Sequence, residues 1–286
     1  MSRAFSSSHG QSHQPIASQR PPVTPLISHS NQLYDRRMFT RTAEERYGGS
    51  DFHNLGYWGP ATRSRREACR TLMERIVGLI PERLRHKNGV CLDVGCGKGA
   101  STRFLTKFYR PENLTGINVS EKQIERCRQN APRCQFFLMD ATHLDFPDDK
   151  FDVVVCVEAA FHFNTRDDFL REARRVLKPG GRLVLTDILV TRRHEKLAKT
   201  RLLANYIPNP RRYSARLEAI GFENIQVVDA TTQCAIRCLE HLLSDSGQEL
   251  TRGKISRETF RRRRSVICRK LNRTRYYVLA AASRPA

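Results

Sequence analysis

The feature that most constrains this fold is a glycine-rich turn that follows a short apolar run. Residues 90–94 read Val-Cys-Leu-Asp-Val, and Gly95, Gly97 and Gly99 follow at alternate positions. Because glycine has no Cβ, it adopts unusual backbone angles and lets a ligand approach the main chain. A glycine turn between a strand and a helix N-terminus holds nucleotide-like ligands in doubly wound α/β sheets. The run therefore predicts a buried strand, a binding turn and a helix that begins near Ser101.

The spacing of this turn excludes two common phosphate-binding motifs. It reads G-x-G-x-G with Asp93 two residues before the first glycine, and not the G-x-G-x-x-G of dinucleotide-binding folds. It is not a P-loop either, because Lys98 is followed by Gly99 instead of by serine or threonine. The ligand class must therefore be inferred from the rest of the chain.

Further apolar segments alternate with helical segments after this turn. The predicted strands are residues 115–119, 135–141, 151–158 and 182–187. A capping-box pattern at Ser120 and another at Thr165 open helices between them, and the second helix ends before the Lys-Pro-Gly-Gly of residues 178–181. Strands that alternate with helices predict a parallel sheet with right-handed crossovers.

The rest of the chain extends this α/β pattern in both directions. Ser64 caps a predicted helix before the first strand, and residues 191–213 form a basic helical cap after the fifth. Residues 225–229 and 276–281 are the sixth and seventh strands, joined through a helical excursion. The prediction is an α/β fold: a Rossmann-like, seven-stranded, mostly parallel sheet with helices on both faces and a helical cap between strands five and six.

Five segments in register resemble class I S-adenosylmethionine-dependent methyltransferases. They are the glycine turn and residues 54–58, 116–120, 157–162 and 177–181. Within that superfamily the segments are similar to natural-product O-methyltransferases of the erythromycin and rebeccamycin sugar type, with relatives among sterol and tocopherol C-methyltransferases. The resemblance runs from about Asn54 to the end of the chain and implies S-adenosylmethionine as the cofactor.

This resemblance implies one methyltransferase domain over residues 34–286, after a tail of residues 1–33. Its predicted parts are an N-terminal helical lid, a cofactor-binding core, the cap, and the C-terminal strands and helix; they span residues 34–88, 89–190, 191–213 and 214–286. The tail is rich in Ser, His, Gln and Pro, so we expect a flexible segment. An organelle transit peptide is the alternative for the tail.

The resemblance also assigns cofactor contacts to the first two strand ends. It implies that Gly95, Gly97 and Gly99 pass under the methionine part of the cofactor, and that Asp93 offsets the charge of its ammonium group. Asn118 stands where most such enzymes carry an acid that accepts from both ribose hydroxyls. Because an amide can accept from one hydroxyl and donate to the other, we expect binding to survive this change.

Further cofactor contacts are expected from the next segments. Ser120 and Gln123 either contact the ligand or form a capping box only. Asp140 and Ala141 fit an adenine pocket, where the carboxylate accepts from the exocyclic amine. Glu158 ends the fourth strand, close to the place of the reactive methyl group.

His162 is the predicted general base. It follows the fourth strand by four residues, at the carboxyl edge of the sheet where ligands bind in open α/β folds. Histidine titrates near neutral pH and can take a proton from an alcohol. The alternative is a packed side chain between two phenylalanines. Asp187 ends the fifth strand, and either assists catalysis with His162 or caps the strand end.

Three aromatic residues are predicted to lie near the substrate. In the resembling family the segment of residues 54–58 lines the site entrance as part of a lid, which assigns Tyr57 and Trp58 to it. The alternative is a surface loop anchored by the only tryptophan of the chain. Tyr206 belongs to the predicted cap over the crevice.

Positive charge accumulates in the last third of this chain, whose net charge is +21. From residue 191 onward 21 lysines and arginines stand against 8 acids, and residues 261–264 are four consecutive arginines. A solvated surface, an anionic substrate or carrier, and nucleic acid are the competing explanations. Four adjacent arginines cannot share one helix face, which disfavours a groove-reading helix.

Cysteine usage and hydropathy bear on the compartment. Nine cysteines without a C-x-x-C pair predict reduced thiols and a cytoplasmic protein. Cys234 and Cys238 lack the partner ligands of a metal site, so none is expected. No apolar run approaches the roughly 18 residues that a membrane span requires.

The sequence therefore predicts an enzyme that methylates a hydroxyl group of a small, partly apolar metabolite, with His162 as general base. The alternatives among enzymes are an amine or phospholipid N-methyltransferase and a C-methyltransferase of a lipid-like substrate. A basic module that binds the cofactor and acts on nucleic acid or on a protein complex is the alternative of another class.

Overall fold

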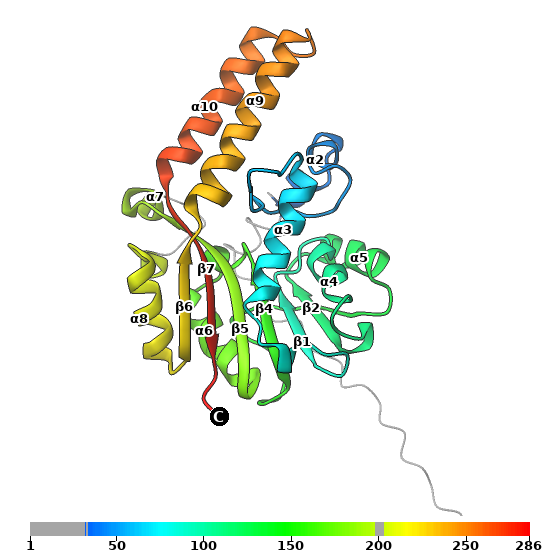
Figure 1. The fold of residues 1–286 in the computed structure, drawn as a ribbon, viewed down its shortest axis with the longest axis vertical. Coiled ribbons are helices and arrows are strands. Elements are labelled where there is room, and N and C mark those ends of the chain that lie inside the picture. The colour runs from blue at the N-terminus through cyan, green and yellow to red at the C-terminus, as the bar shows by residue number, and fades with distance from the viewer. Residues whose placement is uncertain (1–31, 33, 198–202) are drawn as a thin grey trace, which may run out of the picture.

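A seven-stranded sheet forms the centre of the computed structural model, which describes residues 32, 34–197 and 203–286 (Figure 1). The strand order is β3-β2-β1-β4-β5-β7-β6. The strands are β1 (Cys91–Val94), β2 (Leu114–Asn118), β3 (Gln135–Leu138), β4 (Phe151–Val157), β5 (Leu177–Val190), β6 (Glu223–Asp229) and β7 (Thr274–Ser283). The first five pair in parallel, and β7 runs antiparallel to β5 and β6. The predicted sheet is confirmed.

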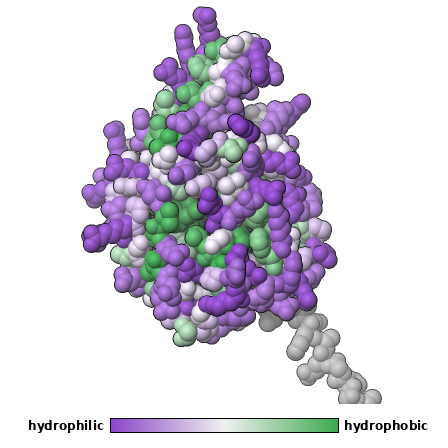
Figure 2. All heavy atoms as spheres, in the orientation of Figure 1, coloured by the Kyte–Doolittle hydropathy of each residue, from purple (hydrophilic) through white to green (hydrophobic). Residues whose placement is uncertain are grey.

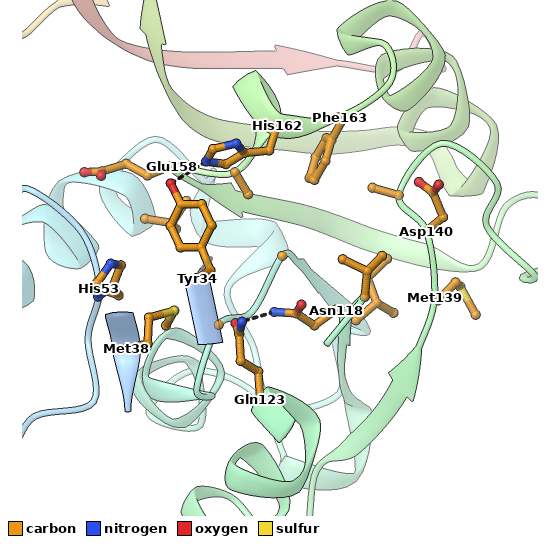
Figure 3. A pocket seen from close by; sticks show the side chains of 17 residues that line it. Tyr34, Met38, His53, Asn118, Gln123, Met139, Asp140, Glu158, His162 and Phe163 are labelled. Atoms are coloured by element: carbon orange, nitrogen blue, oxygen red, sulfur yellow. Dashed lines mark hydrogen bonds between the residues drawn. The ribbon is translucent and has the colours of Figure 1, made fainter. Parts of the chain in front are cut away.

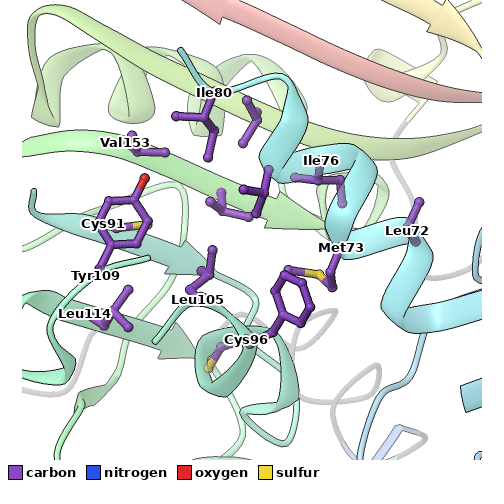
Figure 4. Close-up of a cluster of buried hydrophobic side chains, with 14 of the residues drawn as sticks. Leu72, Met73, Ile76, Ile80, Cys91, Cys96, Leu105, Tyr109, Leu114 and Val153 are labelled. Atoms are coloured by element: carbon purple, nitrogen blue, oxygen red, sulfur yellow. The ribbon is translucent and has the colours of Figure 1, made fainter. Parts of the chain in front are cut away.

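Helices cover both faces of the sheet. One face packs against α3 (Arg65–Gly78), α4 (Ala100–Leu105) and α5 (Glu121–Asn130), the other against α6 (Arg166–Val176) and α8 (Pro210–Ile220). The strands are apolar on both sides because their side chains alternate between these two layers. In β4, for example, Val153 and Val155 belong to one buried cluster and Val154 to the other. Figure 4 shows the cluster under α3.

Side-chain caps fix the starts of the helices that position the site. The hydroxyls of Ser64, Ser120 and Thr165 accept the backbone N–H three residues on, at the starts of α3, α5 and α6. Thr165 and Asp168 complete the reciprocal capping box that the sequence predicts. The helix α4 begins directly after Gly99, whose φ of 83° places it in the left-handed region. These caps satisfy backbone donors that a helix start leaves without partners.

The predicted cap of residues 191–213 is not one helix. Within it lie α7 (Arg192–Leu197), the short η4 (Leu203–Asn205) and the start of α8, while residues 198–202 lie outside the described residues. The predicted tail of residues 1–33 lies outside them too, except for Gln32.

A long helical hairpin joins β6 to β7. It follows a π-helical turn, η5 (Thr231–Ile236), and consists of α9 (Arg237–Thr251) and α10 (Arg257–Arg273). The hairpin projects from the carboxyl edge of the sheet, near α2 (Arg41–Arg46) and α3 (Figure 1). The helical excursion that the sequence predicts between the last two strands is therefore confirmed. Short helical turns, η1 (Glu82–Leu84), η2 (Pro111–Asn113) and η3 (Ala160–His162), complete the described elements.

Two further properties concern the described residues as a whole. All nine cysteines are free, and only Cys268 is exposed. None of the described helices combines the length and the hydropathy of a membrane span.

Candidate functional site

A cavity with an empty volume of about 860 Å³ opens at the carboxyl edge of the sheet (Figure 3). Eight residues that the sequence predicts for the site line it: Gly95, Gly97, Asn118, Gln123, Asp140, Ala141, Glu158 and His162. Asn118 is the last residue of β2, and the others come from the segments after β1, β3 and β4 and from α5. Parallel strands bring these distant segments together because their carboxyl ends meet at one edge.

The glycine turn forms one wall of this cavity. Gly95 and Gly97 have φ angles of 71° and 56°, which favour glycine. A Cβ on Gly95 would lie 2.5 Å from the Cβ of Ala159, another residue of the cavity wall. A smaller cavity of about 330 Å³ continues around the same two glycines, past Lys98 and Ser101. The turn therefore leaves room for a ligand on both sides of its backbone.

Asp93 lies behind the turn and is 1% exposed. Its Oδ2 accepts hydrogen bonds from the hydroxyls of Ser101 and Thr102, each at 2.6 Å. Its Oδ1 is buried and has no hydrogen-bond partner. Burial raises the pKa of this carboxyl, and the two hydroxyls oppose that shift. An unpartnered carboxylate oxygen beside the turn fits the ammonium group that the predicted cofactor carries.

A chain of polar contacts holds Asn118 at the cavity. Its Nδ2 donates to Gln123 Oε1 at 3.1 Å, and its Oδ1 accepts from the backbone of Ser120 at 3.1 Å. Asp35 Oδ1 in turn accepts from Gln123 Nε2 and from the Ser120 hydroxyl, at 2.8 and 2.7 Å. Gln123 thus lines the cavity, whereas Ser120 caps α5 and supports Asn118 from behind.

Asp140 and Ala141 form the far end of the cavity, next to Met139. The Asp140 Oδ1 accepts from both the backbone N–H and the hydroxyl of Thr142, each at 2.9 Å. This turn fixes the carboxylate through one oxygen, so its other oxygen can accept from an amine, as expected of an adenine pocket.

His162 lies at the opposite end, in the turn η3 after β4. Its Nε2 is 2.6 Å from the Tyr34 hydroxyl, and the two rings meet edge to face with centroids 4.8 Å apart. Which of the two atoms donates depends on the imidazole tautomer. The ring also packs against Phe161, with the two ring centroids 4.2 Å apart. His162 therefore both lines the cavity and packs against a neighbouring aromatic ring, so each of the two predicted environments is present in part.

Glu158 connects three segments at the end of β4. Its Oε1 accepts from the backbone N–H of Leu55 and from the Tyr277 hydroxyl, both at 2.7 Å. Its φ of 52° turns the chain at this point. Burial raises the pKa of this carboxyl to about 7, against the effect of those two donors. Glu158 therefore ties the loop of residues 51–58 to the sheet.

Asp187 does not face the cavity, contrary to expectation. It is fully buried, and Arg166 donates to it through Nε at 2.7 Å and through Nη2 at 3.2 Å. The Tyr213 hydroxyl donates to it at 3.1 Å. Both its oxygens are occupied by this buried ion pair, which holds α6 and α8 against β5.

The three predicted substrate aromatics lie outside the cavity wall as well. Trp58 is buried, donates from Nε1 to the Leu55 carbonyl at 2.8 Å and packs on His241. Tyr57 packs under the Arg75 guanidinium. Tyr206 lines a separate surface cavity on α8. Of the loop of residues 51–58, His53 therefore lines the cavity. Tyr57 and Trp58 pack outside the cavity and anchor the loop.

Nine residues of the cavity wall were not predicted from the sequence, and three of them, Tyr34, Met38 and His53, come from the segment before the first strand. Tyr34 and Met38 stand four positions apart, a spacing that puts both on one helix face and could have signalled a buried surface. Burial, with the charge of Arg65, lowers the pKa of His53 to about 3, so this ring stays neutral. Gly99 was expected at the ligand but instead packs on Cys127 at the start of α4.

Comparisons with known proteins show the family of this chain. A family model described as "Methyltransferase domain" matches residues 92–185. The chain is 38% identical over 149 residues to 27-O-demethylrifamycin SV methyltransferase of Amycolatopsis mediterranei. The aligned region covers 50% of this chain and only 53% of that protein. The chain is also 30% identical over 219 residues to O-methyltransferase rstn1 of Aspergillus nomiae, across 72% of this chain and 94% of that protein.

A solved structure shares the fold. The chain superposes with a TM-score of 0.66 on geranyl diphosphate C-methyltransferase of Streptomyces coelicolor, determined with S-adenosyl-L-homocysteine, at 17% identity. The match covers 92% of this chain and 99% of the other.

Proposed function

Since this chain belongs to the S-adenosylmethionine-dependent methyltransferase family, we propose that it methylates a hydroxyl group of a small, partly apolar metabolite, with His162 as general base. The observation that carries this proposal is that His162 lines the same cavity as the glycine turn, Asn118 and Asp140. A group that can take a proton thus stands at one end of the predicted cofactor site.

The cofactor fits the residues of this cavity from end to end. Asp140 and Ala141 would hold the adenine, Asn118 and Gln123 the ribose, and Gly95 and Gly97 the methionine part. Asp93, with its unpartnered Oδ1, would balance the ammonium charge. When bound, the cofactor supplies a sulfonium methyl group for an in-line displacement.

The remaining chemistry belongs to residues of this chain. An acceptor hydroxyl has to lose its proton as its oxygen bonds to the methyl carbon, and the His162 ring would take that proton. Tyr34, bonded to Nε2, would orient the ring before the acceptor arrives. Apolar wall residues such as Met38, Val157 and Phe163 would exclude water, a competing acceptor.

The test is methyl transfer from labelled S-adenosylmethionine to a native extract divided into small-molecule, lipid, RNA and protein fractions. We expect label in the small-molecule or lipid fraction, and a loss of about 10²–10⁴ in rate in His162→Ala. His86→Ala is the matched control, because His86 is exposed and does not line the cavity. Label in RNA or protein would contradict the substrate class.

An amine or a carbon acceptor is the second candidate. One relative is named an O-methyltransferase, and a protein of the same fold is named a C-methyltransferase. The reactions differ in whether the acceptor has to lose a proton to a base as it is methylated. A neutral amine needs no base to attack, so His162→Ala would then leave the rate nearly unchanged. If His162→Ala forms labelled product at the full rate, the acceptor is therefore an amine and not a hydroxyl group.

A further inference from the structure

A second cavity lies between the α9–α10 hairpin and the N-terminal helices. This hairpin groove has an empty volume of about 1490 Å³ and shares no lining residue with the cofactor cavity. One wall comes from α9 and α10, and the other from Thr42, Glu45 and Arg65. The hairpin projects from the edge of the sheet at which α2 and the start of α3 lie in Figure 1. Nothing in the methyl-transfer chemistry uses this groove.

Positive charge dominates the hairpin groove. The cations that line it are Arg65, Arg252, Lys254, Arg262, Arg263 and Lys270, against three carboxylates. Two of these carboxylates are paired with an arginine, in Glu249–Arg263 and Glu45–Arg41, and Asp245 lies 3.1 Å from the His241 ring. Within the described residues, the side chains of Arg252, Lys254 and Arg262 form no ion pair. The groove therefore carries more positive than negative charge.

Arg65 lies at the inner wall of the groove and is only 6% exposed. Its Nη2 donates to the Tyr47 hydroxyl at 3.0 Å and to the Asn54 carbonyl at 3.4 Å. Among the described residues, its Nε and Nη1 have no hydrogen-bond partner and no carboxylate lies within ion-pair distance. The guanidinium packs on the Tyr47 ring, 4.3 Å from its centroid, and Glu158 acts on it only from farther away. A buried charge is costly unless it is paired, so this guanidinium favours an anion nearby.

Apolar side chains accompany these cations. Leu242, Val266 and Ile267 line the groove, and Val266 is 39% exposed on α10. Figure 2 shows apolar surface along the projecting hairpin, between hydrophilic side chains. Apolar area that remains open beside unpaired arginines suits a ligand with both an apolar part and an anionic part.

We propose that the hairpin groove binds an anionic amphiphile, a long-chain carboxylate or phosphate monoester. Its anionic group is held by the charges of Arg65 and Arg262, whose guanidinium forks match carboxylate and phosphate oxygens. Its chain lies on Val266 and Ile267. The inference is independent of the acceptor that the enzyme methylates, because the two cavities are lined by different residues.

The arginine run of α10 provides a matched control. Arg262 and Arg263 line the groove, whereas Arg261 and Arg264 are exposed and do not. Arg262→Glu combined with Lys254→Glu reverses two charges inside the groove. Arg261→Glu combined with Arg264→Glu reverses two charges elsewhere on the hairpin, so the two double variants have the same net charge.

The experiment is calorimetric titration with octyl phosphate, with octanol and inorganic phosphate as part-ligands. We expect octyl phosphate to bind more tightly than either part-ligand, the groove variant to lose at least about tenfold in affinity, and the control variant to stay within about twofold. S-adenosylhomocysteine is titrated into the same samples, so a defect of the cofactor cavity is recognised separately.

Three results would overturn the proposal. Equal losses in both double variants would indicate non-specific attraction, as an RNA or an anionic membrane would experience. Octanol binding as tightly as octyl phosphate would show that the arginines of the groove do not contribute to binding. Absence of octyl phosphate binding, while S-adenosylhomocysteine still binds, would exclude the groove as an amphiphile site.

Discussion

The Tyr34 hydroxyl lies 2.6 Å from His162 Nε2, although 128 positions separate the two residues in the chain. Tyr34 belongs to the helical residues 34–38, before the domain's first strand, and His162 to the turn after β4. The N-terminal segment therefore completes the cavity that the sheet begins. The neighbouring Asp35 reaches Ser120 and Gln123 on the other side, so this short helix is fixed at two places.

Replacing Tyr34 by phenylalanine removes the hydroxyl at His162 and keeps the ring. We expect kcat to fall about threefold to tenfold, the effect of one hydrogen bond, with a smaller change in KM. Steady-state kinetics measure both parameters. Tyr206→Phe, in a separate cavity, is the control; a Tyr34→Phe variant with wild-type kcat would contradict an orienting role.

Asn118→Ala removes the amide that we propose for binding the cofactor ribose. Its loss also breaks the contacts to Gln123 and Ser120, so we expect the affinity for S-adenosylhomocysteine to fall by about tenfold. Calorimetric titration measures this directly. Asn113→Ala is the control, since Asn113 precedes the start of β2, at the opposite end from Asn118, and its amide donates to the Lys87 carbonyl. Unchanged affinity in Asn118→Ala would remove this residue from the cofactor site.

Glu158 makes stability depend on pH. The folded-state pKa is about 7 and the ordinary value 4.5, so the native protein binds more protons than the unfolded chain between these values. Stability from this group is therefore lost as pH rises from about 4.5 to 7, by on the order of 3 kcal/mol in total. Glu158→Gln keeps an acceptor for Leu55 and Tyr277 but cannot ionise. Urea unfolding at pH 5 and pH 8 should show a smaller decrease in the variant; parallel decreases would contradict the prediction.

Gly95→Ala and Gly253→Ala separate backbone strain from crowding. Both glycines have similar positive φ angles, 71° and 68°, but a Cβ on Gly253 meets nothing within 4 Å. We expect Gly253→Ala to cost about 1–2 kcal/mol of unfolding free energy. Gly95→Ala should cost more, because its Cβ would lie 2.5 Å from Ala159, and should also weaken S-adenosylhomocysteine binding. Equal losses in chemical denaturation would show that crowding has no part.

Asp187→Asn distinguishes a structural from a catalytic carboxylate. Removing one partner of the buried pair with Arg166 leaves an unbalanced charge, so we expect a loss of about 3 kcal/mol in stability. At a temperature where the variant is folded, its kcat should match that of the wild type. Asp145→Asn, at an exposed position, is the control. A kcat defect without loss of stability would restore Asp187 to catalysis.

The strands and the glycine turn were predictable because their signals are local. Apolar runs, caps and turns occupy neighbouring residues, and Val153, Val154 and Val155 already indicate a strand that is buried on both faces. Residues that follow such strands, among them Asn118, Asp140 and His162, could be assigned to one edge because parallel strands end together. Asp187 satisfies the same rule, yet Arg166 holds its side chain in the core, because the rule places the backbone and not the side chain.

The sequence by itself thus determined the parallel sheet, the glycine turn and the edge at which the cavity opens, all of which depend on residues close together in the chain. Only the tertiary structure decided which side chains complete the cavity. Tyr34 reaches His162 because a segment far away in the chain folds over the sheet, and Arg166 withdraws Asp187 into the core. Such pairings depend on how helices pack in three dimensions, and no short-range spacing encodes that packing.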